Sequence, residues 1–566
     1  MRLLKVWLLK VWLLKVWLVV WLVVLTGSRS GAQPVDVLWG PSPGEAEARA
    51  ASTPAAPGTT SARLLSLDDP AYRWIDRLQR RGHLLALNPT ALPYTEGEIG
   101  RALLALSAAD LSGVEAVWAE RLRERLSPSL GSDARSGTFG LELAAGGAAS
   151  NNERLDPVRF TDAADPTVEA GGVNLYPNAS GRASLAVGPV VAQLGMGFDL
   201  FYRDDPDGLP VVKELALRNE ETSVGVATPL VDVRLGNLGR HWGRPDGDGV
   251  FVSVNPRSYD AVSLRLGGGT LALRSVAAEL DAATLEGEFT GRTGNQSREP
   301  SLRRYLVAHR FDWRPRPWLT VAFVESMLYS GRNASLSLPS VLPTALYAFL
   351  NDGPPKNNEN NNIIGGLFHV QRGRVAVTGQ LALDDFDVLR KGETAEPASL
   401  ALTGDLTVAG VGHDRVDAGL SLTAVTSRAY DTGFPEQSFL FAERGLGTQF
   451  SDYLHARAFA EAALGRSAGL TVRPELHLLV QGERDIRQPY PANDVPLIFV
   501  GTAERTVRAG LQVRLQPSPW WWVQADLGVN RTSNEGFVDG ATVTRFVGLV
   551  EGGARIRLRA PTRLSW

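Results

Sequence analysis

Val507-Arg508-Ala509-Gly510-Leu511-Gln512-Val513-Arg514-Leu515 places an apolar side chain at every second position, with arginine and glutamine between them. A period of two is the side-chain repeat of a β-strand, whose successive residues point to opposite faces. This segment therefore predicts a strand with one apolar face and one charged face.

The same alternation recurs along the chain from about Gly137 to Trp566. Four further segments, each about ten residues long, show it most clearly: 399–408, 415–424, 454–462 and 523–530. Two architectures contain such strands. A water-soluble β-sandwich turns the charged face to solvent, whereas a transmembrane β-barrel turns the apolar face to lipid.

Three features favour the barrel. The alternation continues for about 430 residues without a helical interlude, as one very large sheet requires. Aromatic residues stand at strand ends, as at Trp313, Trp318 and 520–522, where an interfacial girdle would lie. The last residue, Trp566, is in phase with Ile556, which resembles the terminal strand of outer-membrane barrels. At about 24 residues per strand and turn, we expect an all-β transmembrane barrel of about 18 antiparallel strands, with 16 as the fallback.

The expected connections alternate between short turns, such as the one near 267–269, and long stretches. The long stretches include 236–255, 280–300, 331–362 and 431–451. Outer-membrane barrels have long loops outside the cell and short turns in the periplasm. We expect the same orientation here.

The N-terminal region predicts export. Residues 1–32 combine a basic start at Arg2, an apolar run of ten residues over 16–25 and the small-residue exit Ser30-Gly31-Ala32, which is typical of a secretory signal peptide. Ten apolar residues are too few to span a bilayer as a helix, and no later stretch has 18 consecutive apolar residues. Residues 33–62 are rich in proline and alanine and predict a linker.

Between 63 and 130 the apolar period lengthens to that of helices. Tyr72, Ile75 and Leu78 lie at helical spacing, and Thr95-Glu96-Gly97-Glu98 and Ser112-Gly113-Val114-Glu115 match the capping box that starts a helix. We expect Pro128 to end the last helix. A piece of this length needs another surface to pack against. We therefore expect a small periplasmic α-helical bundle that closes the barrel mouth as a plug.

Composition narrows the classes of function. The chain has no cysteine, so disulfides and thiolate metal sites are excluded, and a net charge of -3 predicts no nucleic-acid partner. The histidines lack metal-ligand spacing, and no motif marks a catalytic nucleophile. We expect no metal, no cofactor and no enzymatic activity. A hydrolase stays open as an alternative, because catalytic triads are spatial rather than sequential.

Four segments carry a family resemblance in this order: LPYTEGEI (92–99), LGNLGRHWG (235–243) followed by FVSVN (251–255), AHR (308–310) followed by Glu325, and GQLALDD (379–385). Together they resemble the capsule assembly protein Wzi family. The resemblance implies an outer-membrane barrel of about 18 strands with a periplasmic helical bundle. It also implies a lectin-like role, in which the protein retains capsular polysaccharide or exopolysaccharide at the cell surface.

Arg240-His241-Trp242, with Arg244 close behind, forms the first predicted ligand-binding site. A tryptophan face packs on the C–H bonds of sugars, and arginine binds the carboxylates of acidic sugars in a bidentate manner. The alternative is an interfacial tryptophan beside a lumen arginine that pairs with an aspartate. The candidate aspartates are Asp232, Asp246 and Asp248.

Asp384, Arg310 and Glu325 are the remaining predicted ligand-binding residues. Asp384 and its neighbour Asp385 could bind a cation or act as acid and base, and the alternative for Asp384 is a salt bridge to lumen arginines. Arg310 and Glu325, with His309, could meet across adjacent strands. The alternative there is a buried arginine–glutamate pair inside the barrel.

The sequence thus predicts a non-enzymatic, polysaccharide-binding barrel in the outer membrane, with its N-terminal bundle in the periplasm. The expected partners are outer-membrane lipid, capsular polysaccharide or exopolysaccharide, and the outer-membrane barrel assembly machinery. Two alternatives stay open: an outer-membrane porin or substrate channel, and an outer-membrane hydrolase.

Overall fold

The structure is a computed structural model of the chain. It describes residues 61–130, 137–151, 173–200, 217–256, 258–283, 302–332, 334–336, 360–384, 399–441, 444–465, 467–486, 488, 491 and 494–562. The predicted signal peptide, most of the predicted linker, Asp385 and Trp566 lie outside these residues, as do most of the predicted long loops at 280–300 and 331–362.

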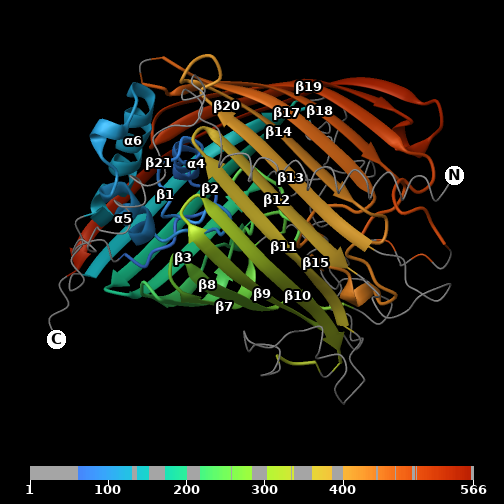
Figure 1. Ribbon diagram of the computed structural model, residues 1–566, viewed down its shortest axis with the longest axis horizontal. Coiled ribbons are helices and arrows are strands. Elements are labelled where there is room, and N and C mark those ends of the chain that lie inside the picture. The colour runs from blue at the N-terminus through green and yellow to red at the C-terminus, as the bar shows by residue number, and fades with distance from the viewer. Residues whose placement is uncertain are drawn as a thin grey trace, which may run out of the picture. The chain divides into compact units, whose positions relative to one another are not determined.

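Eighteen wall strands form one closed antiparallel β-barrel (Figure 1). The first strand, β1 (Gly137–Ser150), pairs with the last, β21 (Thr542–Thr562), and this pairing closes the sheet. β4 (Leu217–Asn219) and β5 (Ser223–Ala227) both pair with β3 (Val190–Asp199) and together make one wall strand. The expected barrel of about 18 strands is confirmed.

The other wall strands are β2 (Asn174–Val187), β6 (Val231–Leu238), β7 (Tyr259–Gly267), β8 (Leu271–Glu279), β9 (Arg303–Arg316), β10 (Leu319–Gly331), β11 (Asn360–Arg372), β12 (Val375–Asp384), β13 (Ser399–Ala409), β14 (Val416–Val425), β17 (Tyr453–Leu464), β18 (Leu470–Gln481), β19 (Glu504–Ser518) and β20 (Trp521–Ser533). A separate two-stranded sheet joins β15 (Leu440–Phe441) to β16 (Arg444–Gly445). It lies in the connection between β14 and β17.

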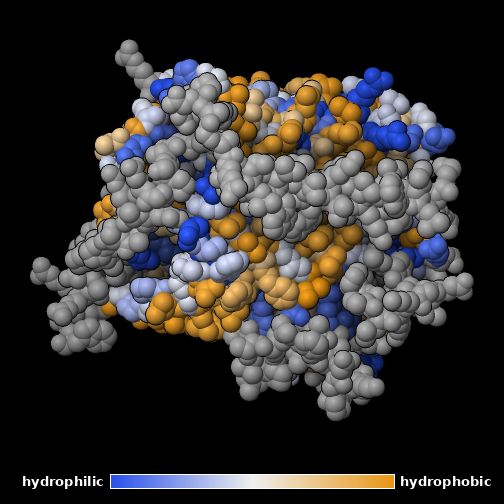
Figure 2. All heavy atoms as spheres, in the orientation of Figure 1, coloured by the Kyte–Doolittle hydropathy of each residue, from blue (hydrophilic) through white to orange (hydrophobic). Residues whose placement is uncertain are grey.

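The alternation of the sequence becomes the two faces of the wall. On β19, Val507 is 50% exposed on the outer face, whereas Arg508 is 2% exposed on the inner face. Apolar residues gather over the outer strands in the space-filling view (Figure 2). A water-soluble sandwich would turn its charged face to solvent, but here that face is enclosed. The outer surface is therefore the one that suits lipid.

The two ends of the barrel differ in their connections. At one end, neighbouring strands are joined by two to six residues, as at 188–189, 317–318, 373–374 and 519–520. We call this the short-turn end. At the opposite end, the long-loop end, the connections are longer, and two of them fold over or into the barrel.

Within the described residues, three α-helices precede the barrel: α4 (Ala71–Gln79), α5 (Glu96–Leu104) and α6 (Gly113–Leu130). The predicted capping box of α5 forms, because Glu98 N donates to Thr95 Oγ1 at 3.1 Å and Thr95 N donates to Glu98 Oε2 at 2.8 Å. The expectation that Pro128 ends the last helix was wrong, since α6 continues to Leu130. Among the described residues, no helix combines the length and the apolar character needed to cross a membrane.

Residues 61–130, which we call the helical segment, occupy the barrel at its short-turn end (Figure 1). Arg81 Nη2 lies 2.6 Å from Asp417 Oδ1 and donates to the carbonyl of Asp414 beside the turn before β14. Arg121 Nη2 donates to the carbonyl of Ser467, in the turn before β18, at 3.0 Å. The polar face of α4 is buried, because it meets the charged inner wall rather than solvent.

The described residues 239–256 and 258, between β6 and β7, turn into the barrel and form what we call the inward loop. The described residues 426–441 and 444–452, between β14 and β17, pack over it and form the outer segment. Ser253 N donates to the carbonyl of Leu446 at 2.9 Å, and Tyr430 Oη donates to the carbonyl of Val250 at 2.7 Å. Both connections lie in stretches that we predicted as long external loops.

An apolar core fills this part of the barrel. It combines buried residues of the inward loop and the outer segment with small and apolar residues of the inner wall. These include Trp242, Val250, Phe251, Phe439, Phe450, Ala308, Val324 and Ala382. Apolar packing of this kind belongs to a protein interior, whereas the lumen of a water-filled channel is polar.

Candidate functional site

The predicted residues of the first site lie on the inward loop, and all of them are buried. His241 pairs through its backbone with Leu92 of the helical segment, with N–O distances of 2.9 and 3.2 Å. His241 Nε2 donates to the carbonyl of Arg244 at 2.8 Å, and burial lowers the pKa of His241. Trp242 is 4% exposed and belongs to the apolar core. Its ring therefore packs inside the protein.

Arg240 is held by neutral groups. Its Nε donates to Ser263 Oγ at 2.9 Å, its Nη1 donates to the carbonyl of Leu238 at 2.8 Å, and its guanidinium lies 5.4 Å from the ring centre of Tyr259. Burial lowers the pKa of Arg240, although Tyr259 offsets part of this effect. Within the described chain, Arg240 forms no ion pair with the three aspartates considered as its partners.

Those aspartates serve other contacts. Asp232 accepts a hydrogen bond from Arg234 Nε at 2.7 Å, and Asp248 accepts one from Thr423. Asp246 lies 2.9 Å from Arg473 of β18 and 3.5 Å from Arg80 of the helical segment. Burial alone would raise the pKa of Asp246, but the surrounding arginines lower it well below its usual range.

Arg244 joins the inward loop to the helical segment. Its Nη2 forms an ion pair with Asp76 of α4, and Asp76 also pairs with Arg80 at 2.5 Å. Asp246 forms an ion pair with Arg473 of β18, across the barrel. Arg244 therefore holds the inward loop to the helical segment, and Asp246 holds it to the wall. Charges buried in this way are stable only when each finds an opposite partner.

Asp384 lies at the end of β12 and is 1% exposed. Its Oδ2 accepts a hydrogen bond from the backbone N–H of Tyr430 in the outer segment. Tyr430 in turn donates to the inward loop at Val250. Asp384 therefore supports the contact between the outer segment and the wall.

Arg310 and Glu325 lie on opposite faces of the wall. The backbone register pairs Glu325 with His309 and Val324 with Arg310. Glu325 and His309 share the outward phase of Phe311 and Phe323, because alternate residues of a strand share a face. The two predicted residues are therefore not brought together by the strand pairing.

On the inner face, Arg310 reaches the helical segment. Arg310 Nη2 donates to Thr90 Oγ1 at 2.7 Å and also lies 2.7 Å from Asp312 Oδ1. On the outer face, the region above His309 is covered by the protein itself. His309 is 6% exposed, and farther along this face Ala334 packs with Met327 and Tyr329.

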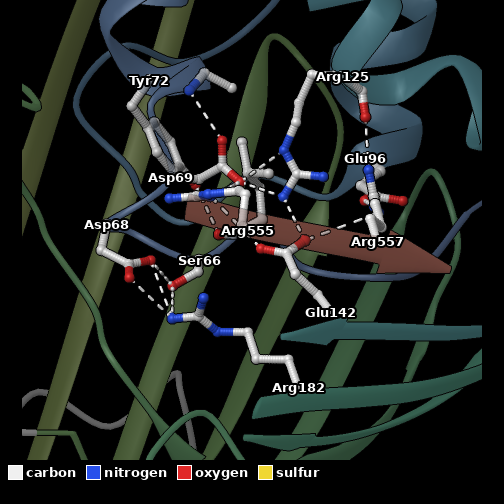
Figure 3. Close-up of polar contacts among 12 residues, drawn as sticks. Ser66, Asp68, Asp69, Tyr72, Glu96, Arg125, Glu142, Arg182, Arg555 and Arg557 are labelled. Carbon is white, nitrogen blue, oxygen red and sulfur yellow. Dashed lines mark hydrogen bonds and ion pairs between the residues drawn. The ribbon is translucent and has the colours of Figure 1, made fainter. Parts of the chain in front are cut away.

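A charged cluster that we did not predict joins the helical segment to the seam between the first and last strands (Figure 3). Arg125 of α6 donates from Nε to Asp69 at 3.0 Å and from Nη2 to Glu142 of β1 at 2.8 Å. Arg557 of β21 donates to Glu96 of α5 at 2.6 Å. Arg555 lies 3.5 Å from both Asp69 and Glu142. We call this the seam cluster.

Electrostatics favours the charged state of the seam cluster. Burial alone would raise the pKa of Asp69, but Arg125 and Arg555 lower it below its usual value. The same acidic groups raise the pKa of Arg125 against the effect of burial. The space enclosed beside the cluster is about 50 Å³. Pockets for small ligands begin near ~300 Å³, so this space suits water rather than a sugar.

The sequence contained a signal for the seam cluster. Arg555, Arg557 and Arg559 alternate with apolar residues on the last strand, and they therefore had to face the interior. Asp69 and Glu96 were present in the predicted plug. What the sequence lacked was the pairing that brings the last strand beside the helical segment.

Among the described residues, no group of three or more acidic or histidine side chains is arranged to hold a metal ion. Apart from Glu325, which lies on the outward phase, the site residues that we predicted join the inward loop, the helical segment, the outer segment and the wall to one another. Their role in binding a ligand stays a prediction.

The comparisons with known proteins concern the fold. No family model and no curated protein matches this sequence. Among solved structures, the chain is similar to Wzi, an Escherichia coli outer-membrane protein involved in group 1 capsule assembly and described as a carbohydrate-binding β-barrel. The TM-score is 0.57 at 13% identity, over 87% of this chain and 99% of that one.

Lower similarity is found to OpdO of Pseudomonas aeruginosa (TM-score 0.41, 11% identity, 75% of this chain and 97% of that one). It is also found to OccAB1 of Acinetobacter baumannii (TM-score 0.40, 10% identity, 74% of this chain and 97% of that one). The resemblance first indicated by four short motifs is thus confirmed as a likeness of fold: this chain has the barrel architecture seen in Wzi.

Proposed function

We propose that this chain is an outer-membrane protein that binds and retains capsular polysaccharide or exopolysaccharide at the cell surface. In this proposal the long-loop end faces outward and the short-turn end, with the helical segment, faces the periplasm. Lipid surrounds the apolar outer face, and the barrel assembly machinery inserts the protein. The proposal includes no catalytic step.

The filled interior is the observation that carries this proposal. A porin or substrate channel needs a continuous aqueous path, whose walls are polar. Here the helical segment, the inward loop and the outer segment lie one after another inside the barrel, and an apolar core joins the last two. A barrel of this kind suits a binding protein better than a channel.

The fold likeness to Wzi, a protein described as carbohydrate-binding, supports a glycan as the ligand. A polysaccharide offers the same sugar unit many times over. Many weak contacts along one polymer then add up, because each bound unit raises the effective concentration of the next. Retention at the surface does not require a deep, tight site for a single sugar.

The test is deletion of the gene, followed by measurement of surface-bound and shed polysaccharide. We expect the bound fraction to fall and the shed fraction to rise, and the intact gene to restore both. An unchanged distribution would contradict the proposal. Turnover of a glycan, lipid or peptide by the purified protein would instead favour the hydrolase.

A further inference from the structure

A cavity of about 460 Å³ lies at the short-turn end, between the helical segment and the wall. Its charged lining comprises Glu98 and Arg101 of α5, Arg265 of β7, Arg274 of β8, and Asp312 and Arg314 of β9. Its volume falls within the range of ~300–1,000 Å³ that is usual for small-molecule sites. We call it the short-turn cavity.

The charged lining carries more positive than negative charge. Asp312 is shared by two cations, since Arg274 donates to it at 3.0 Å and Arg310 lies 2.7 Å away. Glu98 accepts hydrogen bonds from Thr95 in the capping box of α5. Four arginines thus line the cavity beside two carboxylates, one of which is already engaged by two guanidinium groups.

Arg265 and Arg314 contribute charge that no described carboxylate meets in a direct ion pair, because Glu98 and Asp312 act on them only at longer range. Arg265 donates to the carbonyls of Thr228, Pro229 and Gly267, at 3.0, 3.1 and 3.0 Å. These oxygens are neutral, so they orient the guanidinium without cancelling its charge. Within the described residues, Arg265 forms no ion pair.

Arg314 is also oriented by neutral oxygen atoms, and it is 7% exposed. It donates to the carbonyls of Leu85 at 2.7 Å and Ala86 at 3.2 Å, both in the helical segment, and to Thr320 Oγ1 at 3.1 Å. In the part of the chain that the structure describes, it too has no carboxylate partner. A cation held at low exposure without a direct ion-pair partner favours the arrival of an anion.

The rest of the lining is apolar and leads to an open rim. The apolar wall is formed by Leu87, Ala91, Pro93, Ala102, Leu230 and Ala272. The buried end lies near Leu87 and Tyr94, whereas Leu230 and Leu104 at the rim are 64% and 55% exposed. A ligand can therefore enter from the short-turn end, which is the periplasmic side in the proposed orientation.

We propose that the short-turn cavity binds a short segment of an acidic polysaccharide, with a sugar carboxylate on the guanidinium groups and the C–H face of the sugar on the apolar wall. Arginine binds carboxylates in a planar, bidentate manner. The inference rests on the proposed function, because a polysaccharide ligand makes a saccharide the expected occupant. It adds a saccharide site at the opposite end of the barrel from the surface loops, where it meets polysaccharide on the periplasmic side in the proposed orientation.

Isothermal titration calorimetry on the purified full-length protein in detergent tests this inference. The probes are oligogalacturonate of three to six units, a neutral malto-oligosaccharide of the same length, and inorganic pyrophosphate. We expect binding of oligogalacturonate alone. Arg265→Gln and Arg101→Gln should each weaken it by about tenfold or more, because each removes a charged hydrogen-bond donor.

Arg531→Gln is the matched control. Arg531 is an exposed arginine of β20 at the long-loop end, on the same outward phase as Val507, its register partner. This variant should bind oligogalacturonate like the unaltered protein. Heat-modifiable migration in gels checks that all three variants fold.

Three outcomes would overturn the inference: no binding of oligogalacturonate, equal binding by folded Arg265→Gln and Arg101→Gln, or binding of pyrophosphate without the saccharide. Each leaves the proposed function standing if deletion of the gene still releases polysaccharide from the surface. If deletion releases none, the proposed function fails, whatever the cavity binds.

Discussion

The buried arginines of the lumen show how single residues hold this protein together. Arg77 and Arg81 of the helical segment reach Glu461 and Asp417 of the wall, at 2.8 and 2.6 Å. Lipid outside the barrel solvates charge poorly, so an inward position is favoured for the charged residues of the strands. An inward charge without water then needs a partner, and the helical segment supplies it.

Arg125→Met should destabilise the protein by up to about 3–5 kcal/mol. It removes the nearest cation from the buried Asp69 and Glu142 and leaves them only the more distant Arg555 as a shared partner. Arg123→Met is the matched control, since Arg123 lies on the same helix and its one ion pair among the described residues is with the exposed Glu120. It should change the stability by no more than about 0.5 kcal/mol. Thermal unfolding in detergent measures both. Equal effects of the two variants would show that the seam cluster adds nothing to stability.

Glu115 predicts a pH dependence within the helical segment. Burial alone would raise its pKa, but hydrogen bonds from His83 and the Ser112 backbone lower it to about 2. A lowered pKa means that Glu115 stabilises the folded state above its unfolded value near 4.5 and loses this effect as the pH falls towards 2.

Glu115→Gln should therefore destabilise the protein at pH 6 by about 1–2 kcal/mol, which is less than the full shift implies because solvent screens part of the interaction. The difference between the two proteins should shrink as the pH is lowered from 6 to 2. Chemical unfolding monitored by tryptophan fluorescence at several pH values measures it. A difference that stays constant with pH would exclude this carboxylate as the cause.

At the scale of elements, the sequence predicted the strands well and the inward loop poorly. Strand residues such as Arg508 and Val507 repeat at a fixed period, so their faces follow from local geometry. The inward loop has no period. Its apolar Val250-Phe251-Val252 is too short to distinguish a buried loop from an exposed one, and its inward course depends on contacts with distant elements.

The site residues also depend on more than the local period of the sequence. The blurred alternation near His309 and Glu325 left their faces undecided in the sequence, because the outer face there is covered by the chain and is not selected for contact with lipid. The register resolves them onto the outer phase. The arginine-rich lining of the short-turn cavity was missed, since α5 lies far in sequence from the strands β7, β8 and β9 that supply the other arginines.

Trp242→Ala should empty part of the apolar core and cost about 3–5 kcal/mol of stability. Trp313→Ala is the control, because Trp313 is 48% exposed on the outer face, and it should cost about 1 kcal/mol or less. Thermal unfolding in detergent measures the stability of both variants.

In cells, Trp242→Ala should also lower retention of polysaccharide while the barrel still migrates as a folded species, since the loop that Trp242 anchors supports the outer segment. Retention at the normal level in this variant would exclude the inward loop from polysaccharide binding.

At the scale of the whole molecule, the helical segment is built into the barrel rather than appended to it. Its last helix ends at Leu130 and the first wall strand begins at Gly137, so the short connection keeps the two at high effective concentration. The seam cluster then joins this segment to both the first and the last strand. Closing the barrel and filling it therefore use the same residues.

This arrangement predicts almost no current through the intact protein in a planar lipid bilayer. Deletion of residues 63–130 should produce measurable channels, because it opens the short-turn end. Deletion of 243–252 as well should widen them, because the inward loop is the next obstruction along the axis. The single deletion of 243–252 is the control, and with the helical segment still in place it should conduct less than the double deletion. Steady open-channel current from the intact protein would favour the porin. A current that is unaltered after deletion of 63–130 would show that the inward loop and the outer segment alone seal the barrel.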